Sequence, residues 1–270
     1  MIAHLINTDI GNRGILNVYL DYRKSNPRFL NRASSLLLEH NDRVLIVTGF
    51  PIPPLDICET DGPLGALALY NAIEELGGKA DILTYNEVKE ALKPFGVRFT
   101  DAPLLKNYSL LISVELPGRA KDWGYYSMSG HRVKAKPFDG LFLDARELRI
   151  PTIGIGDGGN EVGMGIVRRL IKKHVPLGEK IASIVETDEL VLSAVSNWGA
   201  YGLVAQASLD FGKNLFKGWD ERENLETIVK AGLIDGVLKK ETLSVDGLSV
   251  DLHERFVELL KEIIVDRISP

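Results

Sequence analysis

Residues 151–165, Pro-Thr-Ile-Gly-Ile-Gly-Asp-Gly-Gly-Asn-Glu-Val-Gly-Met-Gly, place two carboxylates in a glycine-rich stretch. The apolar, β-branched run 152–155 predicts a strand, and the amphipathic run ending at His174 predicts a helix after a tight turn. Such a junction lies at the carboxyl end of a strand, where open α/β sheets bind ligands. Asp157 and Glu161 at this place would suit a cation, an amine or a bound metal.

The spacing of the first glycines, at positions 154, 156 and 159, formally matches a dinucleotide-binding fingerprint. That fingerprint works because N–H groups at a helix N-terminus face a pyrophosphate, whereas two negative charges would face it here. We therefore favour a cationic ligand. In another interpretation Asn160 and Glu161 only cap the helix, but this leaves Asp157 between glycines unexplained.

Polar groups also follow other strand-like runs of the chain. Because the carboxyl ends of parallel strands share one edge of a sheet, we expect one pocket, with Asp157 within about 15 Å of Asp61 and Glu115. Asp61 also fits a simple helix cap before Pro63. The expected substrate-binding residues are Thr48, Gly49, Glu59, Thr60, Asp61, Gly62, Arg119, Asp122, Gly158, Gly159, Asn160, Asn197 and Trp198.

Residues 116–130 are too irregular for a helix or strand and have the composition of an ordered recognition loop. Arg119 in this loop is suited to binding a substrate carboxylate through two N–H donors. A structural ion pair of Arg119 with Glu115 or Asp122 explains the same residue equally well.

Oxygen ligands predominate among the candidate metal-binding residues. Asp61, Glu115 and Asp157 are the expected ligands of Mg²⁺ or Ca²⁺, and the acidic motifs lack the histidines and cysteines that hold zinc, apart from Cys58 beside Glu59. A phosphate-binding loop with its lysine is absent from the sequence. We expect that no cofactor is required, with Mg²⁺ or Ca²⁺ as the alternative.

Strand-like runs alternate with helical patterns along the whole chain, which predicts an α/β fold, a three-layer α/β/α sandwich with a mainly parallel, Rossmann-like sheet. The strands are expected at 44–47, 79–84, 108–115, 152–155, 180–186 and 190–195. We expect a single α/β domain over 1–270. Its helical lead-in, 1–40, should carry little chemistry, and a terminal helix within 241–270 should pack on the domain.

The composition restricts the class of protein. The 270 residues are 45% hydrophobic and 26% charged, with a net charge of −5, which argues against nucleic-acid and anionic-membrane partners. The single cysteine excludes a disulfide framework. Without a membrane-length apolar stretch or a signal pattern, we expect a cytoplasmic protein that binds a small molecule, with a homo-oligomer as an open alternative.

Six sequence motifs occur in an order that resembles the D-glutamate cyclase-like family, specifically its C-terminal-domain type. The resemblance covers roughly residues 10 to 265. The motifs are Thr48-Gly-Phe50, Glu59-Thr-Asp-Gly-Pro63, Glu115-Leu-Pro-Gly-Arg119, Gly154-Ile-Gly-Asp-Gly-Gly-Asn-Glu161 with Gly163-Met-Gly165, Asn197-Trp-Gly199 and Val245-Asp-Gly247.

The resemblance implies a lyase that converts D-glutamate to 5-oxo-D-proline and water, or a related amino-acid or carboxylate lyase. The amine must lose protons, so a carboxylate of raised pKa would act as base, and a protonated neighbour would serve the departing oxygen. Asp157, Glu161 and Glu115 are the expected catalytic residues. The N–H groups of Gly158 and Gly159 would stabilise the oxyanion.

Two other classes of function fit the same residues. The first is a divalent-metal-dependent enzyme that acts on a small phosphorylated or carboxylated metabolite. The second is a non-catalytic sensor that binds an amino acid in the same cleft.

Overall fold

The computed structural model describes residues 1–268 and contains a central sheet of five strands. The strands follow the order β4 (Lys79–Leu83), β1 (Arg43–Thr48), β5 (Leu110–Val114), β6 (Thr152–Gly156) and β7 (Glu189–Leu192). All four neighbouring pairs are parallel. β5 and β6 are buried along their whole length, as expected for strands of a parallel sheet that is covered on both faces.

Helices connect these strands and cover the sheet. The α-helices are α1 (Ile2–Leu5), α2 (Ile15–Ser25), α3 (Phe29–Glu39), α4 (Pro63–Glu75), α5 (Asn86–Leu92), α6 (Gly140–Leu148), α7 (Arg168–His174), α8 (Gly178–Ile181), α9 (Ser196–Phe211), α10 (Glu221–Lys230) and α11 (Val250–Ile268). The 3-10 helices are η1 (Lys93–Phe95), η2 (Leu105–Asn107) and η3 (Met164–Val167). Two short hairpins lie outside the sheet, β2 (Pro51–Ile52) with β3 (Ile57–Cys58), and β8 (Ser244–Val245) with β9 (Leu248–Ser249).

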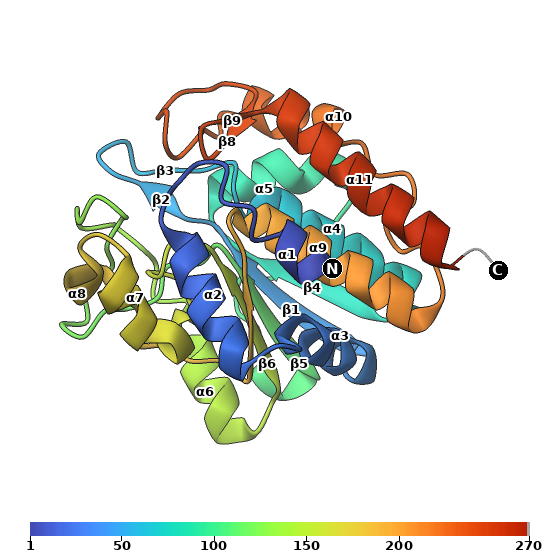
Figure 1. Ribbon diagram of the computed structural model, residues 1–270, viewed down its shortest axis with the longest axis horizontal. Helices are drawn as coiled ribbons and strands as arrows, with labels where there is room; N and C mark the ends of the chain where they lie inside the picture. The colour runs from blue at the N-terminus through green and yellow to red at the C-terminus, as the bar shows by residue number, and fades with distance from the viewer. Residues whose placement is uncertain (269–270) are drawn as a thin grey trace.

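The architecture is a three-layer α/β/α sandwich, as the sequence predicts (Figure 1). Alternate residues of β1 separate the two sides of the core. Val44 and Ile46 belong to the apolar cluster that includes residues of α3, α4 and α9, whereas Leu45 and Val47 pack in a second cluster with Phe142 of α6. This alternation follows from the two-residue period of a strand.

The C-terminal helix α11 packs on α9 and α10, as expected for the terminal segment (Figure 1). Trp198 of α9 stacks on Phe256 with ring centroids 4.1 Å apart, and its indole N–H donates to His253 at 2.9 Å. Among residues 1–268, no helix combines the length and apolar character needed to cross a membrane.

The strand expected at 180–186 is absent. α8 occupies its beginning, and the extended chain after α8 forms hydrogen bonds with loops instead of with the sheet. Val185 accepts from the N–H groups of Gly163 and Gly165, and the N–H of Ser183 donates to the carbonyl of Gly159. The apolar pattern therefore predicted correctly that most of this segment is buried. Its backbone, however, hydrogen-bonds to loops and not to a neighbouring strand.

The helix expected directly after the glycine-rich turn also begins later. Residues 157–163 form an irregular loop, followed by η3 and then α7. Gly163 has φ of +94°, a left-handed conformation that interrupts a helix and that glycine adopts readily. Asn160 and Glu161 consequently do not cap a helix, and that interpretation of them is wrong.

Candidate active site

A cavity of about 250 Å³ opens beyond the carboxyl ends of β1 and β5. In the strand order β4-β1-β5-β6-β7 the connections leave β1 and β5 in opposite directions, so this is the topological switch point where such sheets bind ligands. Phe50 follows β1 and Glu115 follows β5, and both line the cavity. The other polar lining includes Arg13, Glu59, Asn160, Lys239 and Asp246.

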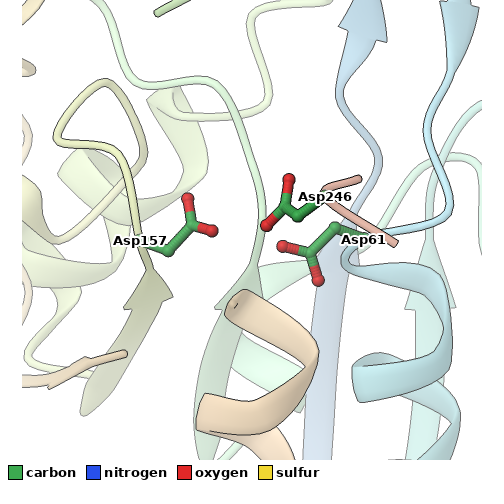
Figure 2. Close-up of side chains that lie close together, drawn as sticks. All are labelled: Asp61, Asp157 and Asp246. Carbon is green, nitrogen blue, oxygen red and sulfur yellow. The ribbon is translucent and has the colours of Figure 1, made fainter. Parts of the chain in front are cut away.

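Carboxylates from distant parts of the chain meet beside this cavity, and Glu115 and Asp246 among them line it directly. Figure 2 shows Asp61, Asp157 and Asp246 pointing toward one another from the loop before α4, the end of β6 and the β8–β9 turn. One oxygen from each lies within 4.8 Å of the others, and the same holds for Glu115, Asp157 and Glu161. The expectation that Asp157 lies close to both Asp61 and Glu115 is confirmed.

Arg13 is the cation of this cluster, and it comes from the segment expected to carry little chemistry. Its Nη1 donates to Asp157 at 2.9 Å and also pairs with Asp246. Asp9 holds the segment by accepting from the N–H groups of Arg13 and Gly14. Burial disfavours the charged guanidinium, but Asp157 and Asp246 outweigh this effect and raise the pKa of Arg13.

Asp61 and Asn197 cap each other's helices. Asp61 accepts from the N–H groups of Ser196 and Asn197 at the start of α9, at 2.9 and 2.7 Å. Asn197 Oδ1 accepts from the N–H groups of Gly62 and Gly65 at the start of α4, at 2.9 and 2.7 Å. The expectation that Asp61 caps the helix beginning at Pro63 is therefore wrong, because Gly62 is the N-cap of α4 and Asp61 accepts from the start of α9 instead.

Glu161 is fixed by the turn in which it lies. Its two carboxylate oxygens accept from the N–H groups of Gly158 and Gly159, each at 2.8 Å. Burial raises the pKa of Glu161, while these two N–H groups oppose the rise. The two glycine N–H groups therefore already have an acceptor, and the expectation that they form an oxyanion hole is wrong.

Glu115 lies against Gly62, which also lies close to the hydroxyl of Thr48. Its backbone has φ of +44°, a conformation that residues other than glycine rarely adopt, and Ser196 Oγ donates to its carboxylate at 2.5 Å. A side chain at Gly62 would collide with Glu115 and Thr48, so this position requires glycine. Burial, and then the neighbouring Glu161, raise the pKa of Glu115 well above its usual range.

Glu59 differs from the other carboxylates because it faces the cavity without a hydrogen bond or ion pair among the described residues. Its carboxylate lies directly against the Cα of Gly236. Burial, and then Asp246 and Asp61, raise the pKa of Glu59 well above its usual range, with Arg13 opposing. The neighbouring Thr60 has a structural role, because its hydroxyl donates to the carbonyl of Ser244 at 2.9 Å.

Of the expected binding residues only Glu59 and Asn160 line the cavity, and three of the others also lie apart from the carboxylate groups. Arg119 forms an ion pair with Asp139, which accepts from Nε at 2.6 Å and from Nη2 at 2.8 Å. The expected partners, Glu115 and Asp122, take no part in this pair. Asp122 is half exposed and bonds to Tyr126. Trp198 is fully buried between α9 and α11. None of these three residues lines the cavity. Their positions after strands in the sequence therefore did not suffice to predict that they face a ligand.

Arg13 and Asp246 are the site residues that the sequence analysis missed. Asp246 lies in the Val245-Asp-Gly247 turn, with φ of +55°, and its motif was the available signal. Asp235 positions this region, because its two oxygens accept from the N–H groups of Val237 and Gly247 at 2.8 Å each. No comparable signal marks Arg13, since its position in the site depends on how the lead-in packs.

Comparison with known proteins agrees with the resemblance seen in the motifs. The family model described as "D-glutamate cyclase-like, C-terminal" matches residues 2–261. Human mitochondrial D-glutamate cyclase is 35% identical over 239 residues. The match covers 75% of this chain and 37% of the human protein, so the chain spans little more than a third of that relative's length.

Among solved structures, exonuclease RecJ bound to manganese covers 75% of this chain and 42% of that chain, with a TM-score of 0.37 and 14% identity. RecJ of Thermus thermophilus in complex with Mn²⁺ covers 76% and 24%, with a TM-score of 0.36 and 14% identity. Scores this low carry no conclusion about this chain. The family match and the human relative show that this chain belongs to the D-glutamate cyclase-like family, and the match is to the C-terminal domain of that family.

Proposed function

We propose that this chain catalyses the cyclisation of D-glutamate to 5-oxo-D-proline and water. The observation that carries the proposal is the carboxylate of Glu59, which faces the cavity at the switch point of the sheet, unpartnered among the described residues and of raised pKa. The 35% identity to a D-glutamate cyclase supports the choice of reaction.

The reaction requires proton transfer from nitrogen to oxygen. The substrate ammonium loses two protons as nitrogen bonds to the side-chain carboxyl carbon, and the carbon–oxygen bond that breaks releases water carrying both protons. No external acid or base is consumed, so one carboxyl group can accept and return each proton. A raised pKa brings a glutamate closer to neutral pH and suits it to this role.

Glu59 fits this role better than the three carboxylates proposed from the sequence. Asp157 is paired with Arg13, Glu161 accepts two glycine N–H groups, and Glu115 accepts the hydroxyl of Ser196. These partners favour the charged form of each carboxylate and so oppose uptake of a proton. We therefore assign proton transfer to Glu59 and the surrounding negative charge to attraction of the substrate ammonium.

The cavity also offers groups for the substrate carboxylates. Arg13 lines the cavity, and its guanidinium has five N–H donors, not all of which are used by Asp157 and Asp246. Ser127, Ser129 and Lys239 also line it. Phe50 and Met128 supply apolar walls that would shield the reacting groups from water.

The test is to incubate the purified chain separately with D-glutamate and L-glutamate and to measure 5-oxoproline by chiral chromatography. We expect product from D-glutamate. Binding of D-glutamate, shown by a raised melting temperature, without any product would favour the non-catalytic sensor. Absence of both product and binding would overturn the proposal for this chain.

A further inference from the structure

The two groups of carboxylates that share Asp157 differ in how their charge is balanced. In the group of Asp61, Asp157 and Asp246, Arg13 contacts two members, and Asp61 accepts N–H groups from the start of α9. That group already has its positive partners. A further cation there would have to compete with a guanidinium that is held in place by Asp9.

The second group consists of Glu115, Asp157 and Glu161. Among residues 1–268 the one cation that pairs with this group is Arg13, which Asp157 shares with Asp246. Two of its members accept only neutral donors, Ser196 Oγ for Glu115 and glycine N–H groups for Glu161. Each carboxylate oxygen has two lone pairs, so these bonds leave acceptor capacity for another ligand. All three side chains are buried, where unbalanced negative charge is costly.

Asn160 gives an independent sign of a missing partner. The residue is only 2% exposed and lines the cavity, and its Oδ1 has no hydrogen-bond partner in the described chain, although its Nδ2 donates to the carbonyl of Tyr126 at 2.7 Å. A Cβ placed on Gly158 would touch both Asn160 Oδ1 and Glu161 Oε1, so the two oxygens flank the same point. A buried, unpaired amide oxygen calls for a donor or a cation with its water.

The geometry satisfies the requirement for a shared ion. One oxygen from each of Glu115, Asp157 and Glu161 lies within 4.8 Å of the others. Two ligands at about 2.0–2.6 Å from one ion can be separated by no more than about 4–5 Å. A donor set made only of carboxylate and amide oxygens suits Mg²⁺, Mn²⁺ or Ca²⁺ and disfavours zinc.

We propose that Glu115, Asp157 and Glu161 bind one hard divalent cation, Mg²⁺ or Mn²⁺, and that Asn160 Oδ1 accepts from a water on that ion. This replaces the set expected from sequence, because Glu161 takes the place of Asp61. The site is independent of which reaction the cavity performs, and its test is a binding measurement, so it can fail or hold separately from the cyclase proposal.

The experiment titrates Mn²⁺ into the chelator-treated full chain at pH 7.5 and follows free Mn²⁺ by electron paramagnetic resonance. We expect one site, with Mg²⁺ as a competitor. Glu161→Gln should weaken Mn²⁺ binding by roughly tenfold or more, since even loss of a group that only supports a ligand weakens affinity about 10–100-fold.

Glu59→Gln is the matched control, because it also removes one buried carboxylate, which acts electrostatically on Glu115, but leaves the proposed ligands intact. We expect it to change Mn²⁺ affinity by less than about threefold. Equal weakening by the two variants would mean a diffuse electrostatic effect and would overturn the site. Failure of the wild type to bind Mn²⁺ at millimolar concentration would overturn it as well.

Glu115→Gln provides a second ligand variant if Glu161→Gln does not fold. Its amide oxygen can still accept from Ser196 Oγ, so the fold should survive, while the negative ligand is lost. The same loss of at least roughly tenfold is expected. Wild-type affinity in a folded Glu115→Gln protein would contradict the proposal.

Discussion

Replacement of Glu59 by glutamine should remove the proton-transfer group of the cavity and leave the fold intact. Loss of a general base typically lowers the rate about 10²–10⁴-fold, which corresponds to about 3–5 kcal/mol of activation free energy. Because the Glu59 carboxylate has no hydrogen bond or ion pair to lose among residues 1–268 and lies near Asp246 and Asp61, the melting temperature should stay unchanged or rise.

The pH dependence of the rate gives a second measure of the same group. A base must be deprotonated to act, so activity should fall as pH decreases through the pKa of Glu59. Burial and the nearby Asp246 raise this pKa, so the fall should occur at higher pH than for an ordinary glutamate. The residual rate of Glu59→Gln should lack this acidic limb.

Gly236→Ala tests the position of the carboxylate without changing its chemistry. The added methyl group would overlap the carboxylate of Glu59, whose flexible side chain can move aside at little cost in stability. We expect a lower kcat with a nearly unchanged melting temperature, because a misplaced base loses alignment with the substrate.

The assay for these variants is the initial rate of 5-oxoproline formation from D-glutamate, with thermal unfolding and circular dichroism recorded on the same samples. Wild-type rates in Glu59→Gln would refute the assignment of proton transfer. A large fall in melting temperature would instead show that Glu59 stabilises the fold. That result would contradict the prediction, which rests on Glu59 having no hydrogen-bond partner among residues 1–268.

Three further variants test the remaining features. Asp157→Asn keeps one acceptor for Arg13 but loses the charge, and we expect the free energy of unfolding in urea to fall by about 1–2 kcal/mol; an unchanged value would contradict the ion pair's role. Asn197→Ala leaves the N–H of Gly65 at the start of α4 without its acceptor, while the N–H of Gly62 keeps Asp61, and should cost about 1–3 kcal/mol in the same assay. Burial raises the pKa of Glu221 to about 7. Between pH 4.5 and 7 the folded state therefore holds a proton that the unfolded state releases, so the free energy of unfolding should fall by about 3 kcal/mol as the pH rises through this range. Glu221→Gln should remove that fall, and persistence of the full fall in the variant would refute the assignment.

The central strands could be predicted from sequence because their signal is local. Strands buried on both faces must be apolar almost throughout, and β1, β5 and β6 each overlap a run expected from that property. The placement of Glu115 and Asp157 at one edge then follows from parallel strands ending together. The run at 180–186 is equally apolar, but its backbone bonds to the loop after β6, and a pattern of side chains does not report that choice.

The sequence by itself determined the family, the layered α/β fold and the presence of an acidic site after β6, since these depend on motifs and on the period of apolar residues. Only the tertiary structure decided the partners of each charge. Arg13 and Asp157 are 144 residues apart, and Asp246 reaches them from a turn near the C-terminal helix. Their meeting depends on the packing of the lead-in and of the β8–β9 hairpin around the sheet. An ion pair of this kind requires two side chains within about 4 Å, and no periodicity along the chain encodes that distance.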